Sequence, residues 1–243
     1  LTPNSNYDLM CLKMLYLALA EMAEARQSEA EATHWRHLAE ALGPYHVDAD
    51  GALLITPYYN KPTQEGLYLH FKAIAETVDL PLVLYNVPGR TGCALSPACV
   101  EALSHHPHIV ALKEASGNMS QIQNIIARRP AGFEVLSGDD SITLALMSMG
   151  ADGVISVTSN CCPGLVSEMV RNAQSDKFEI AKSIHNKLLP MFGALFCESN
   201  PIPIKYVMGI MGYGNGCPRL PLTPLSEKGR EILDPILRDL GIN

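Results

Sequence analysis

The stretch IVALKEASGNMSQIQNIIARRPAGFEVLS, residues 109–137, decides the fold, because it places a helix-like segment between two short apolar runs. Ile109–Lys113 and Glu134–Ser137 are predicted to be strands buried on both faces. Ser120–Arg128, between them, is predicted to be a helix. A strand, a helix and a second strand in this order indicate a parallel pair joined by a right-handed crossover.

The same pattern continues on both sides of this stretch. Further strands are predicted at Ala52–Thr56, Leu82–Asn86 and Gly153–Thr158, and further helices at Glu65–Thr77, Pro97–His105 and Ser141–Met149. Ser96 before Pro97 is a typical helix start, with a capping side chain followed by proline at the first helical position. The sequence thus predicts five consecutive strand-then-helix units.

Such units form either a closed barrel or an open doubly wound sheet. No G-x-G-x-x-G or G-x-x-x-x-G-K motif opens any of the helices, which removes the usual reason to prefer a nucleotide-binding open sheet. A length of 243 residues also suits one (β/α)₈ barrel of about 250 residues. We therefore predict a barrel over residues 1–160 and a helical region over residues 161–243, with helices at Gly164–Gln174, Phe178–Phe196, Pro203–Met211 and Ser226–Leu240.

Composition excludes several classes of protein. The chain is 47% apolar and only 18% charged, which is too hydrophobic for a disordered protein. Its net charge of −7 argues against a nucleic-acid partner or an anionic membrane surface. Leu9–Ala20 is too short for a membrane span and contains Lys13, so we expect a packed helix there. The irregular spacing of the cysteines predicts reduced thiols and a cytoplasmic location.

Lys113 is the strongest chemical candidate, because it ends the apolar run of its predicted strand. Burial of an ammonium is costly, and it would lower the pKa of this amine toward the range that a nucleophile needs. An amine of this kind can form an imine with a ketone. The alternative is a lysine that extends to solvent or pairs with Glu114.

Tyr85 and Arg90 are two further candidate site residues, and they lie at and just after the end of the preceding predicted strand, Leu82–Asn86. Tyr85 lies at its carboxyl end, where barrel enzymes gather their reacting groups, and its phenol could relay protons. The alternative is a rim tyrosine bonded to a backbone carbonyl. Arg90 is presented by a Pro-Gly turn, and its planar group suits a carboxylate, although a loop arginine can also be only a solvated charge.

Other polar groups are weaker candidates. The histidines around Pro107, and His34 with His37, lack clear acidic or thiol partners, so we expect no metal site. Cys161 and Cys162 are adjacent, which disfavours a mutual disulfide. Asp139 and Asp140 are expected to cap the helix that follows them.

Seven ordered motifs closely resemble the dihydrodipicolinate synthase family, part of the N-acetylneuraminate lyase and class I aldolase-like group. They are ITPYYNKPTQEGLYLHF (55–71), LYNVPGRTG (84–92), VALKEASGN (110–118), LSGDD (136–140), DGVISVTSN (152–160), ESNPIPIK (198–205) and RLPLTPLS (219–226). The resemblance runs from about residue 50 to the C-terminus. It implies an α/β TIM (β/α)₈ barrel with a C-terminal helical extension.

The resemblance also implies roles for individual residues. Lys113 matches the Schiff-base lysine, Tyr85 the proton-relay tyrosine, and Arg90 the arginine that holds the carboxylate of the second substrate. Tyr59 matches a tyrosine that reaches into the neighbouring subunit's site, and Tyr58 one that lines a lysine feedback pocket. The backbones of two further residues match positions beside bound pyruvate, namely Gly138 and Ile155.

The implied reaction joins pyruvate to L-aspartate 4-semialdehyde, a step of lysine and diaminopimelate biosynthesis. No metal or organic cofactor is implied, because the lysine imine is itself the electron sink. The implied assembly is a homotetramer, a dimer of dimers, with L-lysine as a feedback inhibitor. Two alternatives remain: another pyruvate-dependent 2-keto-acid aldolase or dehydratase, and a catalytically inactive relative with a structural or regulatory role. Arg90 favours the synthase, because the sister lyases usually lack the G-R-T-G turn.

The N-terminal part departs from the family pattern. A G-T-T-G-E loop that binds the pyruvate carboxylate is absent, as is a third-strand segment resembling I-A-G-T-G. The helices that should flank that strand are expected near Leu1–Ala25 and Ser28–Leu42. We therefore predict that the first barrel strands are missing from this sequence, with an omission at Gln27–Ser28. If no residues are missing there, the inactive-relative alternative gains weight.

Overall fold

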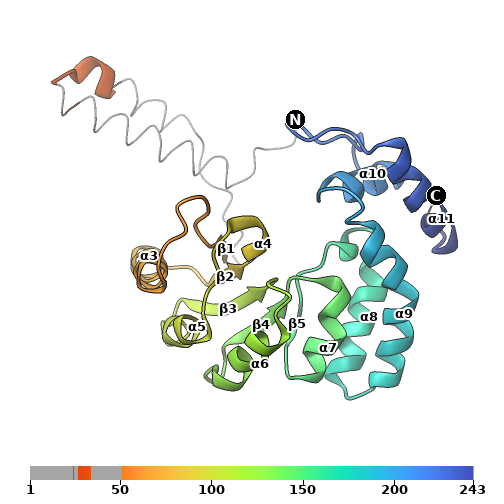
Figure 1. The fold of residues 1–243 in the computed structure, drawn as a ribbon, viewed down its shortest axis with the longest axis horizontal. Helices are drawn as coiled ribbons and strands as arrows, with labels where there is room; N and C mark the ends of the chain where they lie inside the picture. The colour runs from red at the N-terminus through yellow and green to blue at the C-terminus, as the bar shows by residue number, and fades with distance from the viewer. Residues whose placement is uncertain (1–23, 25–26, 34–50, 243) are drawn as a thin grey trace. The chain divides into compact units, whose positions relative to one another are not determined.

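The computed structural model describes Glu24, residues 27–33 and residues 51–242. Residues 52–242 lie in one compact unit, in which strands and helices alternate as far as β5 and helices follow (Figure 1). The described residues contain one sheet of five parallel strands in the order β1-β2-β3-β4-β5, so each strand pairs with the next one along the chain. The strands are β1 (Ala52–Ile55), β2 (Leu82–Asn86), β3 (Ile109–Glu114), β4 (Glu134–Ser137) and β5 (Gly153–Val154).

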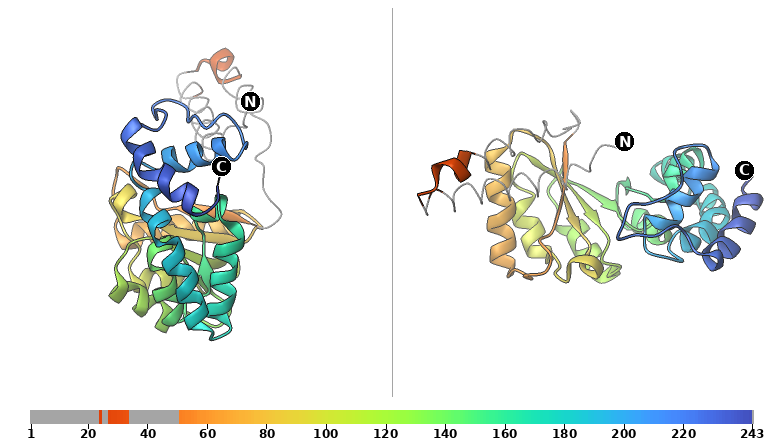
Figure 2. Two further views of the ribbon diagram at one scale, coloured as in Figure 1. Left: turned by 90° about the vertical axis from the view of Figure 1, so that its right-hand side faces the viewer. Right: turned by 90° about the horizontal axis from the view of Figure 1, so that it is seen from above.

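The crossover helices α3, α5 and α6 follow the first three strands. Figure 2 shows the long helix α3 lying along one face of the sheet. That face is apolar: Phe71 of α3 is fully buried in one cluster with Leu84 of β2 and Leu112 of β3. Burial of a side chain of this size contributes about 1.5 to 3 kcal/mol. The bounds are α3 (Gln64–Thr77), α5 (Pro97–Leu103) and α6 (Met119–Arg128).

Side chains that accept backbone hydrogen bonds set where these helices begin. Thr63 accepts from the backbone N–H of Gly66 at 3.1 Å, and Asn118 accepts from that of Gln121 at 3.1 Å. The predicted start at Ser96 is confirmed, since its hydroxyl accepts from the N–H of Cys99 at 3.2 Å and Pro97 is the first helical residue. A four-residue helix, α4 (Pro88–Thr91), was not predicted.

The predicted strand Gly153–Thr158 is wrong in its second half. The ladder ends after β5 with a single further bond, from the N–H of Ile155 to the carbonyl of Ser137 at 2.9 Å. Thr158 instead begins a short 3-10 helix, η2 (Thr158–Asn160). Its backbone N–H and its hydroxyl both donate to the buried carboxylate of Asp140, at 2.9 and 2.8 Å. These two bonds draw the chain off the ladder.

The region after β5 is helical, as predicted. A second apolar cluster holds these helices together and includes Met169, Leu188, Val207 and Leu233. Helices α8 and α9 run side by side (Figure 1). The helices are α8 (Pro163–Gln174), α9 (Phe178–Ala194), α10 (Ile202–Ile210) and α11 (Glu227–Asp239), and before them lie η1 (Asp140–Ile142) and α7 (Thr143–Ser148). The predicted division at residue 160 stays an interpretation.

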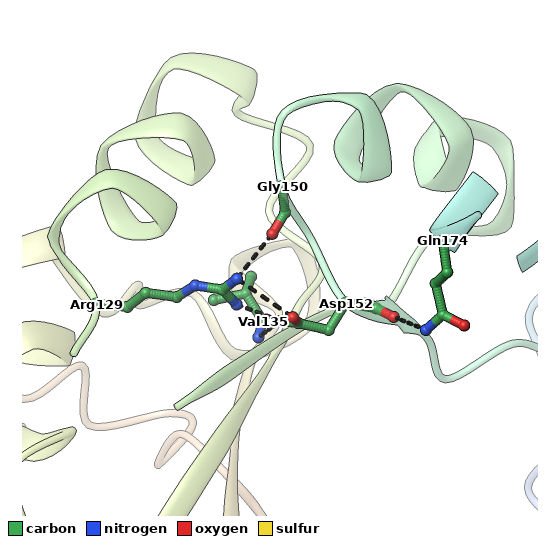
Figure 3. A network of polar contacts seen from close by, with 5 residues as sticks. All are labelled: Arg129, Val135, Gly150, Asp152 and Gln174. Atoms are coloured by element: carbon green, nitrogen blue, oxygen red, sulfur yellow. Dashed lines mark hydrogen bonds and ion pairs between the residues drawn. The ribbon is translucent and has the colours of Figure 1, made fainter. Parts of the chain in front are cut away.

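Polar contacts hold the chain together at the amino ends of β4 and β5 (Figure 3). The carboxylate of Asp152 pairs with the guanidinium of Arg129 and accepts from the N–H of Val135 at 2.7 Å. Arg129 also donates to the carbonyl of Gly150 at 2.9 Å, and Gln174 of α8 donates to that of Asp152 at 2.8 Å. This network therefore lies at the opposite ends of the strands from Lys113.

Little of the expected N-terminal structure falls within the described residues. The helix expected at Leu9–Ala20 lies outside them, as does most of the one expected at Ser28–Leu42. Gln27 is a turn residue with a φ of 61°, and the N–H of Ala32 donates to the carbonyl of Ser28 at 3.0 Å in a helical segment. The omission at Gln27–Ser28 stays a prediction. No helix among the described residues is long and apolar enough to cross a bilayer.

Candidate active site

Lys113 and Tyr85 are direct neighbours across two parallel strands. The register of β2 and β3 places them opposite each other, one residue before the carboxyl end of each strand. The Nζ of Lys113 lies 4.1 Å from the centroid of the Tyr85 ring, which is within the range of a cation–π contact. The structure thus brings together the two residues for which the sequence predicts imine chemistry.

Burial changes the proton affinity of both groups. It lowers the pKa of the Lys113 amine, an effect that the negative charge of Asp140 partly offsets. It raises the pKa of the Tyr85 phenol, an effect that the positive charge of Arg90 partly offsets. The amine is therefore free at a lower pH than that of an ordinary lysine, while the phenol keeps its proton. A nucleophile beside a proton donor is what carbinolamine formation and dehydration require.

Glu114 is not the partner of Lys113. Adjacent residues of a strand point to opposite faces, and both carboxylate oxygens of Glu114 have other donors. Its Oε2 accepts from Asn86 at 2.8 Å, and its Oε1 accepts from the N–H of Ser116 at 2.7 Å. The alternative in which Glu114 neutralises the lysine is therefore wrong, and the amine remains on the other face of the sheet, beside Tyr85.

Gly138 follows β4 and lies against the lysine side chain. A Cβ atom at this position would stand 3.2 Å from the Cε of Lys113, 3.2 Å from the carbonyl oxygen of Glu114 and only 2.8 Å from the Cβ of Ala115. The N–H of Gly138 donates to that same carbonyl at 2.7 Å. Ile155 follows β5 in the corresponding position. The structure thus places both backbones at the edge of the sheet where Lys113 lies.

Arg90 lies in α4, directly after β2. Its side chain is exposed, and among the described residues it makes one long polar contact, 3.4 Å from Nη2 to the carbonyl oxygen of Asn200 before α10. Its charge is nevertheless close enough to affect the pKa of Tyr85. A guanidinium whose donors are largely unused, near the phenol, can bind the carboxylate of a substrate.

Tyr58 and Tyr59 lie in the loop between β1 and α3. Tyr58 is 52% exposed and Tyr59 is 93% exposed, with a positive φ of 69° for Tyr59. Within the described part of the chain, no hydrogen bond joins Tyr59 to Lys113 or Tyr85. The structure of one chain thus leaves this tyrosine outside the group formed by the other candidates.

Several buried polar residues beside the site were not recognised from the sequence. Asn86 and Glu114 each follow a candidate residue and are fully buried. Asp140 does not cap a helix, because its carboxylate instead accepts from Thr158, whereas Asp139 does cap η1 by accepting from the N–H of Ser141 at 3.0 Å. One sequence feature could have revealed Asn86 and Glu114: each is a polar residue at the carboxyl end of a strand that is otherwise apolar.

The remaining candidates do not form a metal site among the described residues. No group of three or more histidine, cysteine, aspartate or glutamate side chains within the described residues is arranged to hold a metal ion. His108 has a structural role instead, with Nδ1 2.8 Å from the carbonyl oxygen of Ala75 and Nε2 3.3 Å from the carboxylate of Asp79. Cys161 and Cys162 are buried free thiols, and His34 and His37 lie outside the described residues.

Known proteins similar in sequence cover most of this chain. The 4-hydroxy-tetrahydrodipicolinate synthase of Geotalea uraniireducens is 48% identical over 215 residues, which are 88% of this chain and 72% of the relative. That of Stutzerimonas stutzeri is 50% identical over 195 residues, 80% of this chain and 66% of the relative. That of Koribacter versatilis is 48% identical over 193 residues, which are 79% of this chain and 64% of the relative. The chain thus spans 64% to 72% of the length of these three relatives.

Solved structures give the same result. A dihydrodipicolinate synthase from Aquifex aeolicus has a TM-score of 0.79 at 39% identity, covering 96% of this chain and 82% of that one. A chloride-inhibited dihydrodipicolinate synthase from Acinetobacter baumannii, complexed with pyruvate, has a TM-score of 0.78 at 44% identity. The match covers 97% of this chain and 82% of that one. A dihydrodipicolinate synthase from Cyanidioschyzon merolae with lysine bound has a TM-score of 0.78 at 38% identity. The match covers 88% of this chain and 71% of that one.

These neighbours confirm the predicted fold class, an α/β TIM barrel with a C-terminal helical part, of which the described residues contain five strands. The family model described as the dihydrodipicolinate synthetase family matches residues 25–240. That match covers the sheet, the helical region and every candidate residue named above. The chain belongs to the dihydrodipicolinate synthetase family.

Proposed function

We propose that this chain condenses pyruvate with L-aspartate 4-semialdehyde to give 4-hydroxy-tetrahydrodipicolinate, in the biosynthesis of lysine and diaminopimelate. The observation that carries the proposal is the amine of Lys113, 4.1 Å from the Tyr85 ring centroid, with its pKa lowered by burial. The curated relatives bear the name of this synthase, and one solved relative was crystallised with pyruvate.

The reaction follows from the chemistry of these side chains. The free amine of Lys113 attacks the keto carbon of pyruvate, and Tyr85 donates the proton with which the carbinolamine oxygen leaves as water. The imine loses a methyl proton and becomes an enamine, whose carbon attacks the aldehyde of the second substrate. The amino group of that substrate then displaces Lys113 and closes the ring, so the lysine is regenerated. The lysine supplies the electron sink in this scheme.

The other proposed residues have distinct roles. The backbones of Gly138 and Ile155 lie beside bound pyruvate, and Arg90 holds the carboxylate of the semialdehyde. Tyr59 reaches the site of a neighbouring subunit in a homotetramer, and its 93% exposure in one chain suits such a role. Tyr58 lines a pocket for L-lysine as a feedback inhibitor, and a solved relative with lysine bound supports this regulation. We propose a cytoplasmic location.

Reductive trapping tests the central claim. The protein is treated with pyruvate and borohydride, and its mass and peptides are then measured. We expect one reduced pyruvyl group per chain, on Lys113, because borohydride converts an imine into a stable secondary amine and Lys113 is the amine whose pKa burial lowers. Lactate replaces pyruvate in the control, since it has no ketone. Label on a different lysine, or no label at all, would overturn the proposal and favour the inactive-relative alternative.

The Arg90→Ala variant tests the identity of the second substrate. We expect pyruvate labelling of Lys113 to be unchanged, because Arg90 serves the semialdehyde. The specificity constant for the semialdehyde is expected to fall roughly 10- to 150-fold, since a charge-assisted contact contributes about 1.5 to 3 kcal/mol. Steady-state kinetics with each substrate varied in turn measures both effects. An equal loss of pyruvate binding would give Arg90 another role and would favour the aldolase alternative.

A further inference from the structure

Asn86 and Glu114 form a second cross-strand pair, one residue beyond the reactive one. They are opposite each other in the register of β2 and β3, and both have no exposed surface. The Nδ2 of Asn86 donates to the Oε2 of Glu114 at 2.8 Å. Because side chains alternate along a strand, this pair lies on the sheet face opposite to Tyr85 and Lys113.

The remaining atoms of the pair are bonded to the loops that follow the two strands. The Oδ1 of Asn86 accepts from the N–H of Leu95 at 3.0 Å, and the Oε1 of Glu114 accepts from that of Ser116 at 2.7 Å. The backbones are joined as well, since the N–H of Ala115 donates to the carbonyl of Asn86 at 2.8 Å. The pair thus joins the carboxyl ends of both strands to the segment before α5 and to the start of the loop after β3.

A buried carboxylate is costly, because its charge loses hydration. Burial raises the pKa of Glu114, while the hydrogen bonds from Asn86 and Ser116 oppose that rise. Two residues earlier on the same face of the sheet, both strands carry buried apolar residues, Leu84 and Leu112, which belong to one cluster. Packing alone therefore does not account for a charged group here, whereas a directional link between two strand ends does.

We propose that Asn86 and Glu114 are positioning residues, which fix the ends of β2 and β3 so that the amine of Lys113 stays aligned with the phenol of Tyr85. The proposal rests on the function proposed for Lys113. The pair acts through the backbone of the residues beside it and does not contact substrate. A displacement of about 1 Å between reacting groups can slow an enzymatic step about 100-fold, so a small slip of one strand end is enough.

Reversing the donor and the acceptor provides the test. Asn86→Asp alone places two carboxylates against each other, and Glu114→Gln alone removes one of the two acceptor oxygens. The double variant N86D/E114Q keeps all three side-chain bonds. In it, the aspartate accepts from Leu95 and from the glutamine amide, and the glutamine oxygen accepts from Ser116. The double variant should therefore recover what the single variants lose.

The rate of pyruvate trapping on Lys113 is measured for each variant, as a ratio to the wild type at every pH, and thermal unfolding is followed in parallel. We expect trapping to be about 10-fold slower in Glu114→Gln, about 100-fold slower in Asn86→Asp near neutral pH, and within about 3-fold of the wild type in the double variant. In Asn86→Asp the ratio should rise as the pH falls, because a proton shared by the two carboxyls restores a hydrogen bond.

Glu101→Gln is the matched control. It removes the negative charge from an ion pair of 3.3 Å with Arg128, between α5 and α6, and should label at the wild-type rate. If Asn86→Asp does not fold, the comparison of Glu114→Gln with the double variant still decides the matter.

Wild-type trapping rates in folded single variants, or a double variant slower than both singles, would overturn the positioning role. A loss of thermal stability with an unchanged trapping rate would assign the pair a purely structural role and would also overturn it. An unlabelled wild-type protein is a different result, because it refutes the proposed function first and this inference with it.

Discussion

Lys113→Arg is expected to lose all pyruvate-dependent labelling and to reduce synthase activity to that of the uncatalysed reaction. The guanidinium stays protonated at any working pH, so it cannot attack a ketone. It can still stack on the ring of Tyr85, which keeps the local packing close to that of the lysine. The loss should therefore be chemical, with an unfolding temperature close to that of the wild type.

Intact-protein mass after borohydride reduction measures this result directly. Lys182→Arg is the control, because Lys182 lies on α9 with 61% of its side chain exposed, and it should be labelled like the wild type. Residual label in Lys113→Arg would mean that another amine forms the imine. A loss of folded structure in circular dichroism would leave the labelling of the wild type at Lys113, mapped by peptide, as the deciding measurement.

Gly138→Ala is expected to lower stability and to slow the trapping of pyruvate, because there is no room for the added methyl group. The new Cβ would lie 2.8 Å from that of Ala115 and 3.2 Å from both the Glu114 carbonyl and the Cε of Lys113. Either the end of β3 moves away from β4, or the lysine side chain leaves its position beside Tyr85. Overpacking of this kind lowers the free energy of unfolding by about 1 to 3 kcal/mol. Trapping on Lys113 should slow as well.

Urea unfolding measures the free energy of unfolding of Gly138→Ala, and the borohydride assay measures the rate of pyruvate trapping on Lys113. Gly193→Ala in α9 is the control, since a Cβ there meets no described atom within 4 Å apart from its chain neighbours and the backbone of its own helix. Alanine in place of a helical glycine should raise the unfolding free energy by roughly 0.5 to 1 kcal/mol and leave labelling unchanged. If Gly138→Ala is as stable and as reactive as the wild type, the close contact with the lysine has no role in the site.

The strand positions could be predicted because buried parallel strands are continuous apolar runs. The carboxyl ends of β1 and β3 differ from the prediction by one residue each. The strand β5 is four residues shorter than predicted, because Ile155 and Val157 continue the apolar pattern although the ladder ends before Thr158 bonds to Asp140. That contact joins residues 18 apart, so no local pattern reveals it. Helix α4 was not predicted because its local pattern is misleading: four residues that begin Pro-Gly are typical of a turn.

The reactive residues could also be predicted, because Lys113 and Tyr85 each end an apolar run. Their partners could not. Asn86 is the polar last residue of its predicted strand and Glu114 the first residue after its own, and only the register of β2 and β3 shows that they are buried against each other. Sequence reasoning considered a pair between Lys113 and Glu114, since they are neighbours in the chain. The alternation of side chains across the sheet separates them.

The pairing of Tyr85 with Lys113 bears on which genetic changes this protein can tolerate. Their alignment comes from the hydrogen-bonded register of two adjacent strands, so it does not depend on the length of the segment that connects them. Insertions around His105 and His106, near the end of that segment, leave the reactive pair in place. Deletion of one residue inside either strand turns one of the two groups to the opposite face of the sheet. The connecting segments can therefore change in length during evolution, whereas the length and register of β2 and β3 have to be kept.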